Sequence, residues 1–375
     1  IEGAVDEDGR DGKASGGPFG DGKNQQGIIF YNNLIDRLLL LGIIPIVTLS
    51  HWDIPQALDD EYGGLLSPEI TKDFLDFANL CFTEFGDRVK HWITFCGPWS
   101  VAYTGYGTGT IAPGRGVSSS AVETFAARSL LPPDLTFSQS YRTRIHRDAS
   151  GDPGTEPYLV GHHQLLAHAA AVKLYRENYE STQKGKIGII LQQIWPVALT
   201  DTEEDRAAAQ RCKDYMLGCM KDFVGSRLPA FTDEESKMVK GSYDFIALNY
   251  YTAAYVRDAP EAADGPPSVV TDPRIAYERI DEIDDPSLTR WECLTDHWRV
   301  SYYQRHLSNL KRAISEDEVN VKGYFIWSLT DNFEWGASIY SRFGNAYIDY
   351  DNGHTRNPKL SAEWFKVHLL KPTPR

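Results

Sequence analysis

Short β-branched runs alternate with longer stretches of helical periodicity along most of the chain, and this alternation constrains the fold more than any other feature. Five runs are expected to form strands: 43–49, 91–95, 186–191, 243–251 and 321–329. Apolar residues recur at helical spacing in the stretch before each run, in 27–41, 68–89, 158–178, 203–223 and 296–315. Such alternation predicts a parallel α/β sheet or barrel.

Polar and aromatic residues follow several of these strands directly. The first strand closes with Ser50-His51-Trp52-Asp53, and the second is followed by Cys96-Gly97-Pro98-Trp99. In parallel α/β folds the loops after the strands carry the functional groups. The sequence therefore favours a site at the carboxyl ends of the strands.

Composition excludes several classes of function. The 375 residues are 42% hydrophobic, enough for a large core, and no run approaches the roughly 18 apolar residues that a membrane span needs. The net charge of −14 would repel a nucleic-acid backbone. The five cysteines show no metal-binding spacing, so we expect no zinc site. The acidic run 281–285 lacks the EF-hand pattern, so we expect no other metal ion either.

We expect one domain over residues 1–375, with irregular loops at 116–154 and 258–286. The first of these segments is rich in Ser, Ala and Arg, and the second is rich in prolines and acids. The chain starts at Ile1, and the residues after it lack the basic and apolar regions of a signal peptide, so we expect the true N-terminus to lie upstream. Neither the compartment nor the oligomeric state has a signal in the sequence.

Several strand-end motifs occur together and in order. They are His51-Trp52-Asp53-Ile54-Pro55, Trp92-Ile93-Thr94-Phe95, Asn249-Tyr250-Tyr251-Thr252 and the run from Trp327-Ser328-Leu329 to Phe333-Glu334-Trp335. With these motifs the chain resembles family 1 glycoside hydrolases, the retaining β-glucosidases, and is most similar to their plant members. The resemblance covers nearly the whole chain apart from 116–154 and a few junctions.

The resemblance implies a (β/α)₈ TIM barrel that binds a β-glucoside or glucose at its C-terminal face and needs no cofactor. In this family two glutamates hydrolyse the β-O-glucosidic bond: one protonates the leaving oxygen, and the other, about 5 Å away, attacks the anomeric carbon. Carried over by position, His51 and Trp335 would bond sugar hydroxyls, and Glu334 would bridge two hydroxyls. Trp327 would stack under the ring, whereas Asn249 and Tyr251 would line the same pocket.

The catalytic motifs of the family are altered in this chain. The acid/base motif Thr-Phe/Leu-Asn-Glu-Pro corresponds here to Thr94-Phe95-Cys96-Gly97-Pro98, so the proton donor has become Gly97. No nucleophile motif is found, and Glu278 is a poor stand-in for it. Cys96 is expected to be a buried structural thiol rather than a nucleophile.

The first, second and seventh barrel strands of the family are absent or replaced, which predicts an incomplete barrel of about five recognisable strands. Removing strands from a closed barrel exposes unpaired edges. Three hypotheses stay open: a β-glucosidase-type hydrolase by descent that leans towards inactivity, a non-catalytic sugar-binding pseudoenzyme, and a truncated gene product that does not fold stably.

Overall fold

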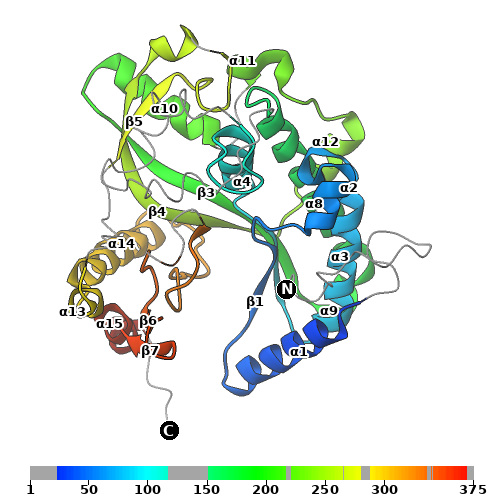
Figure 1. The fold of residues 1–375 in the computed structure, drawn as a ribbon, viewed down its shortest axis with the longest axis vertical. Helices are drawn as coiled ribbons and strands as arrows, with labels where there is room; N and C mark the ends of the chain where they lie inside the picture. Colours follow the sequence, from blue (N-terminus) through cyan, green and yellow to red (C-terminus); the bar gives the residue numbers. More distant parts are fainter. Residues whose placement is uncertain are drawn as a thin grey trace. The chain divides into compact units, whose positions relative to one another are not determined.

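The computed structural model describes residues 23–116, 151–216, 221–264, 266–279, 288–335, 339 and 341–369. The chain divides into two compact units, 1–281 and 282–375 (Figure 1). None of the described helices is long and apolar enough to cross a membrane.

A five-stranded sheet organises the first unit. Its order is β1 (Ile46–Ser50), β2 (His91–Cys96), β3 (Lys186–Ala198), β4 (Phe245–Asp258) and β5 (Ile275–Arg279). The first four strands are parallel, with Ile46 opposite His91 and Gly188 opposite Phe245, whereas β5 runs antiparallel to β4. Within the described residues the strand order does not return to β1, so the sheet is open at both edges.

One long helix precedes each parallel strand, as predicted. These helices are α1 (Gln25–Leu40), α3 (Ile70–Phe85), α8 (Glu156–Asn178) and α10 (Glu203–Met216). The other helical segments among the described residues of this unit are shorter: α2 (Gln56–Tyr62), α4 (Pro98–Val101), α9 (Glu180–Gln183), α11 (Lys221–Val224), α12 (Asp233–Val239) and the turns Gly64–Leu66, Ala102–Gly107, Gly225–Arg227 and Pro260–Asp264. The predicted pairs of helix and strand are thus confirmed for the first four strands.

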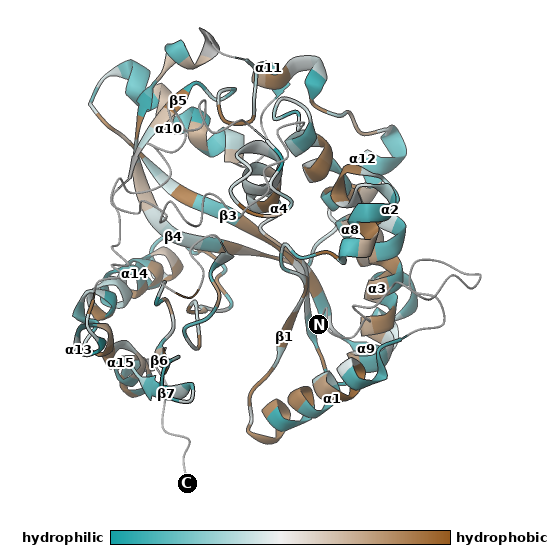
Figure 2. Cartoon of the chain, in the orientation of Figure 1, coloured by the Kyte–Doolittle hydropathy of each residue, from teal (hydrophilic) through white to brown (hydrophobic). Residues whose placement is uncertain are grey.

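The largest apolar core of the first unit lies between α3, α8 and the sheet, where the apolar faces of these elements meet (Figure 2). Phe82 is fully buried, and its ring centroid lies 5.1 Å from that of Trp92 and 5.0 Å from that of Tyr175. The parallel strands need cover on this face because their side chains are apolar, which explains why Trp92 and Ile187 have no exposed surface.

The sheet has five strands, the number expected, but its fifth member differs from the prediction. Residues 321–329 form no strand, and an isolated bridge to Ala346 is made by Thr330, directly after them. An apolar run becomes a strand only where a neighbouring backbone completes its ladder. Instead, β5 forms inside the segment 258–286, which was expected to be irregular; most of the other irregular segment, 117–150, lies outside the described residues.

Among the described residues of the second unit there are helices and one hairpin. The unit contains α13 (Arg290–Leu294), α14 (His297–Ser315) and α15 (Leu360–Leu369), with β6 (Ala346–Asp349) antiparallel to β7 (Thr355–Pro358). Tyr303 of α14 packs on Phe365 of α15, with ring centroids 6.1 Å apart. Asp296 accepts hydrogen bonds from the backbone N–H and the hydroxyl of Ser361, at 2.9 and 2.6 Å, which ties the start of α14 to the start of α15.

Candidate functional site

In the first unit, hydrogen bonds join the carboxyl ends of β1 and β2 to each other and to Asn249 in the first half of β4. The Trp52 indole N–H donates to the Cys96 carbonyl at 2.7 Å, and the Asn249 amide donates to the Cys96 sulfur at 3.3 Å. The ends of parallel strands meet at one edge of the sheet. The motifs around His51, Cys96 and Asn249, which are far apart in sequence, therefore lie together beside the carboxyl end of β2.

His51 lies beside Trp52 at the end of β1. The two rings make an edge-on contact, with centroids 5.5 Å apart. Burial lowers the pKa of His51, although the nearby Asp53 carboxylate acts in the opposite direction. A neutral imidazole offers one donor and one acceptor, which suits hydrogen bonding to a hydroxyl.

Asn249 and Tyr251 lie on β4, where alternate residues share a face of the sheet. Asn249 is opposite Gln192 of β3 and is half-buried, whereas 42% of Tyr251 is exposed. Both residues thus lie in the first half of β4, and Tyr251 is the more accessible of the two.

Gly97 lies between β2 and α4, as the N-cap residue of α4, in a left-handed conformation with φ 56° and ψ 61°. Its N–H donates to the Ile190 carbonyl at 2.9 Å, which fixes the peptide at the edge of the sheet. A Cβ at this position would lie 3.2 Å from the Ser100 hydroxyl oxygen, and left-handed backbone disfavours residues with a side chain. The local backbone is therefore adapted to glycine.

The neighbouring Cys96 is a free, buried cysteine. Burial raises the pKa of its thiol, and the hydrogen bond from Asn249 opposes this only in part. A thiol with a raised pKa is a poor nucleophile at neutral pH. These properties agree with the expected structural role.

In the second unit, Trp327 and Glu334 form a pair. The Trp327 indole N–H donates to a carboxylate oxygen of Glu334 at 2.8 Å. Trp327 is 42% exposed, Glu334 and Trp335 are half-buried, and Trp335 has a positive φ of 44°. An exposed indole beside a carboxylate offers an apolar surface and a hydrogen-bond acceptor together, the two features that a sugar ring requires.

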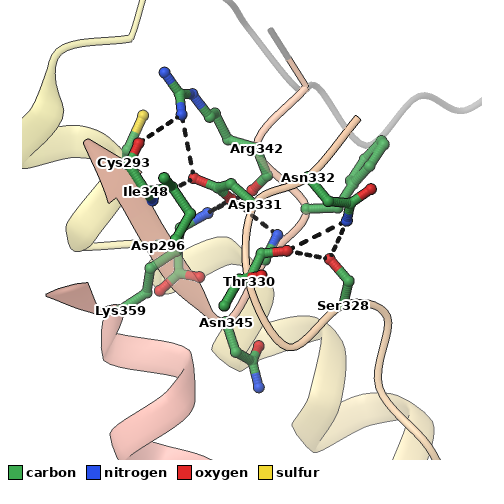
Figure 3. A network of polar contacts seen from close by, with 12 residues as sticks. Cys293, Asp296, Ser328, Thr330, Asp331, Asn332, Arg342, Asn345, Ile348 and Lys359 are labelled. Atoms are coloured by element: carbon green, nitrogen blue, oxygen red, sulfur yellow. Dashed lines mark hydrogen bonds and ion pairs between the residues drawn. The ribbon is translucent and has the colours of Figure 1, made fainter. Parts of the chain in front are cut away.

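A buried charge network surrounds Asp331, which lies between Trp327 and Glu334 in the sequence, and its partners were not predicted (Figure 3). The Asp331 carboxylate has no exposed surface and lies 3.0 Å from the Lys359 ammonium and 3.5 Å from the Arg342 guanidinium. The only signal in the sequence was a charged residue within a strongly apolar segment, which is costly to bury without partners. Its partners are distant in sequence: Arg342 lies 11 residues and Lys359 lies 28 residues after Asp331.

The structure groups the predicted residues by unit. His51, Asn249 and Tyr251 belong to the first unit, and Trp327, Glu334 and Trp335 belong to the second. Glu278 is opposite Tyr255 in the antiparallel strand β5. The described residues contain no group of three or more His, Cys, Asp or Glu that could hold a metal ion.

Comparison with known proteins gives a consistent answer. The model of glycosyl hydrolase family 1 matches residues 17–292 and 266–371. The chain is 43% identical to raucaffricine-O-β-D-glucosidase of Rauvolfia serpentina over 410 residues, covering 93% of this chain and 74% of the relative. It is 41% identical to oleuropein β-glucosidase of Olea europaea over 424 residues, covering 96% and 74%.

Solved structures agree with these relatives. A rice β-glucosidase superimposes with a TM-score of 0.81 at 36% identity, covering 93% of this chain and 80% of that one. A family 1 β-glucosidase from the fungus Humicola insolens, solved with glucose, superimposes with a TM-score of 0.79 at 32% identity, covering 92% and 79%. Both structures are of β-glucosidases.

The chain therefore belongs to glycosyl hydrolase family 1 and is homologous to its plant β-glucosidases. It has the α/β TIM-barrel fold of that family, with a sheet that is open within the described residues.

Proposed function

We propose that this chain is a family 1 hydrolase by descent that still binds glucose or a β-glucoside but hydrolyses β-glucosides far more slowly than its relatives, if at all. The observation that carries the proposal is Gly97, which stands where the family resemblance places the proton donor. Glycine has no titratable group, and the left-handed backbone of Gly97 is unfavourable for a residue that has one.

The loss of a general acid has a predictable size. Proton transfer by a positioned side chain contributes typically 10²- to 10⁴-fold to the rate. The effect is greatest for a sugar or alkyl leaving group, which needs a proton to depart, and smallest for an activated aryl group. Any residual hydrolysis should therefore favour activated aryl glucosides.

The second glutamate of the mechanism also lacks a counterpart. Glu278, the nearest candidate, lies in a strand that runs antiparallel to β4, whereas the seventh strand of a TIM barrel is parallel to its neighbours. The family match falls into two pieces that overlap at 266–292, in the same part of the chain. The alignment with the Rauvolfia enzyme is 410 residues long, longer than the 375-residue chain, so some aligned positions have no residue here.

Binding, in contrast, needs residues that the chain keeps. In the first unit His51 follows β1 and Asn249 lies on β4, and in the second unit Trp327 is paired with Glu334. The Humicola relative was solved with glucose. We therefore assign this chain a glucose unit as ligand and leave the aglycone open.

The test measures hydrolysis and binding separately on the full chain. Hydrolysis is followed with 4-nitrophenyl β-glucoside and with an alkyl β-glucoside, and glucose binding by calorimetry. We expect no turnover of the alkyl glucoside and measurable binding that Glu334→Gln weakens about tenfold, which corresponds to one hydrogen bond to a charged group. Glu316→Gln is the control, because Glu316 is an exposed partner of Arg312. Hydrolysis of the alkyl glucoside at the rate of a plant relative would refute the proposal.

A further inference from the structure

We infer that Asp331 and Lys359 are positioning residues that hold the segment 327–335 in the conformation that pairs Trp327 with Glu334. The role of that pair in sugar binding rests on the proposed function. The positioning itself rests on the contacts of the second unit alone (Figure 3).

The Asp331 carboxylate is saturated with donors. One oxygen accepts from the Lys359 ammonium at 3.0 Å and from the Gly344 N–H at 2.9 Å, and the other accepts from the Ile348 N–H at 3.2 Å. Asp331 and Lys359 have side-chain exposures of 0% and 1%. A buried carboxylate with these partners has one arrangement that satisfies it, so it fixes the backbone that carries it.

Backbone hydrogen bonds hold the same segment against residues 343–346. The Asn345 N–H donates to the Ser328 carbonyl at 2.8 Å, and the Asp331 N–H donates to the Ala346 carbonyl at 2.9 Å. The approach is so close that a Cβ on Gly344 would lie 1.9 Å from the Asp331 nitrogen. The segment therefore has little freedom to shift along its neighbour.

A turn carries this constraint to both members of the pair. The Asn332 amide donates to the Ser328 hydroxyl at 2.9 Å and to the Thr330 carbonyl at 3.2 Å, which closes the turn between Trp327 and Glu334. Trp327 precedes the turn and Glu334 follows it, so their 2.8 Å hydrogen bond depends on the turn. Preorganising the two side chains in this way lowers the entropy cost of binding a ligand.

The ion pair between Asp331 and Lys359 is better explained by a role in fixing the conformation of 327–335 than by a gain in stability. A buried ion pair is often no more stabilising than a well-packed apolar pair of similar volume, and its best-attested use is to fix register. Lys359 also donates to the Arg342 carbonyl, which holds the other side of the same loop. Exchange of both charges for apolar groups should thus spare stability while it releases the segment.

The experiment uses the full chain labelled with ¹⁵N-tryptophan, and the indole N–H signal of Trp327 is assigned by its loss in Trp327→Phe. Glu334→Gln defines the signal position that results when the carboxylate partner is removed. In Asp331→Asn and in the double variant Asp331→Leu/Lys359→Met we expect the Trp327 signal to move at least half of the way to that position. We expect glucose affinity to fall about tenfold in both variants.

Asp349→Asn is the matched control, because Asp349 is also a buried carboxylate paired with an arginine, at 3.3 Å from Arg290, but none of its hydrogen bonds reaches 327–335. We expect its Trp327 signal to stay at the wild-type position. The decisive case is the double variant. The positioning role is supported if the double variant has the thermal stability of the wild type while its Trp327 indole signal stays displaced. If both the stability and the Trp327 signal of the double variant match the wild type, Asp331 and Lys359 are merely structural and the inference is wrong.

Failure of the proposed function has a different signature. If the wild-type chain binds no glucose, the proposed function fails, and the indole signal alone decides the positioning role. An unmoved signal in Asp331→Asn overturns the inference whether or not glucose binds.

Discussion

The two units of the chain are stabilised by different interactions. All the apolar core clusters found among the described residues lie in the first unit, where Phe82, Trp92 and Tyr175 pack with no exposed surface. In the second unit the buried apolar residues found in the described part are Cys293, Tyr303 and Ile348, whereas its buried polar residues include Asp331 and Lys359. Apolar packing is not directional and specifies a fold, whereas buried charges demand particular partners and specify the geometry of a loop.

The largest effect is expected from a cavity in the core of the first unit. Phe82→Ala should lower the free energy of unfolding by about 3–5 kcal/mol, because Phe82 is fully buried between Trp92 and Tyr175. Chemical denaturation followed by tryptophan fluorescence measures it. Phe30→Ala is the control, since Phe30 is 61% exposed, and it should change stability by less than about 0.5 kcal/mol. Equal losses in the two variants would contradict an apolar core centred on Phe82.

A nearly equal effect is expected when one charge of the second unit is removed. Lys359→Met leaves the buried Asp331 carboxylate without its ammonium partner and should cost about 3 kcal/mol. Adding Asp331→Leu should recover most of that loss, because the remaining uncompensated charge is then gone. Chemical denaturation of the whole chain measures the loss of stability in Lys359→Met and in the double variant. The rate of limited proteolysis within 282–375 shows whether the loss belongs to the second unit.

Lys366→Met is the control for the lysine, because its side chain is 70% exposed and its contact with Glu363 is 3.9 Å long. It should have no measurable effect. If the double variant is as unstable as Lys359→Met, the second unit depends for its stability on the buried charges themselves. The first unit, in contrast, depends on apolar packing.

A smaller, pH-dependent effect should belong to the first unit. His168 is buried, with its Nδ1 atom 2.7 Å from the Thr94 hydroxyl oxygen, and burial lowers its pKa from 6.5 to about 4. Between those values the unfolded chain binds a proton that the folded chain excludes, so stability falls as the pH drops. From pH 7 to pH 5 this loss amounts to about 2 kcal/mol.

Urea denaturation at several pH values measures this dependence. His168→Gln should flatten the change between pH 7 and pH 5, whereas His354→Gln, at an exposed turn, should leave it as in the wild type. An unchanged slope in His168→Gln would assign the pH response to other groups.

Much of the first unit could be predicted from local sequence pattern. The helical periodicity before each of the first four strands matches α1, α3, α8 and α10, because the apolar face of a helix follows from the spacing of apolar residues within the helix itself. The strand-end motif also indicated that His51 follows a strand, and β1 ends at Ser50; Asn249, in contrast, lies in the first half of the long strand β4.

Other elements depend on partners that are distant in sequence. The apolar run 321–329 has the composition of a strand but forms none, whereas β5 forms at 275–279 because β4 offers it a free backbone edge. Composition reports what a segment is able to become. Only the neighbouring backbone decides whether a ladder forms.

By itself, the sequence determined the family, through motifs spread along most of the chain, and the four parallel pairs of helix and strand, because each motif and each helical face is carried by residues close together in the chain. The tertiary structure alone decided the left-handed backbone at Gly97 and the fifth strand of the sheet. It also decided the partners of Asp331, since Lys359 lies 28 residues away. The physical reason is that a buried charge or an open strand edge is satisfied by whichever group folding brings to it.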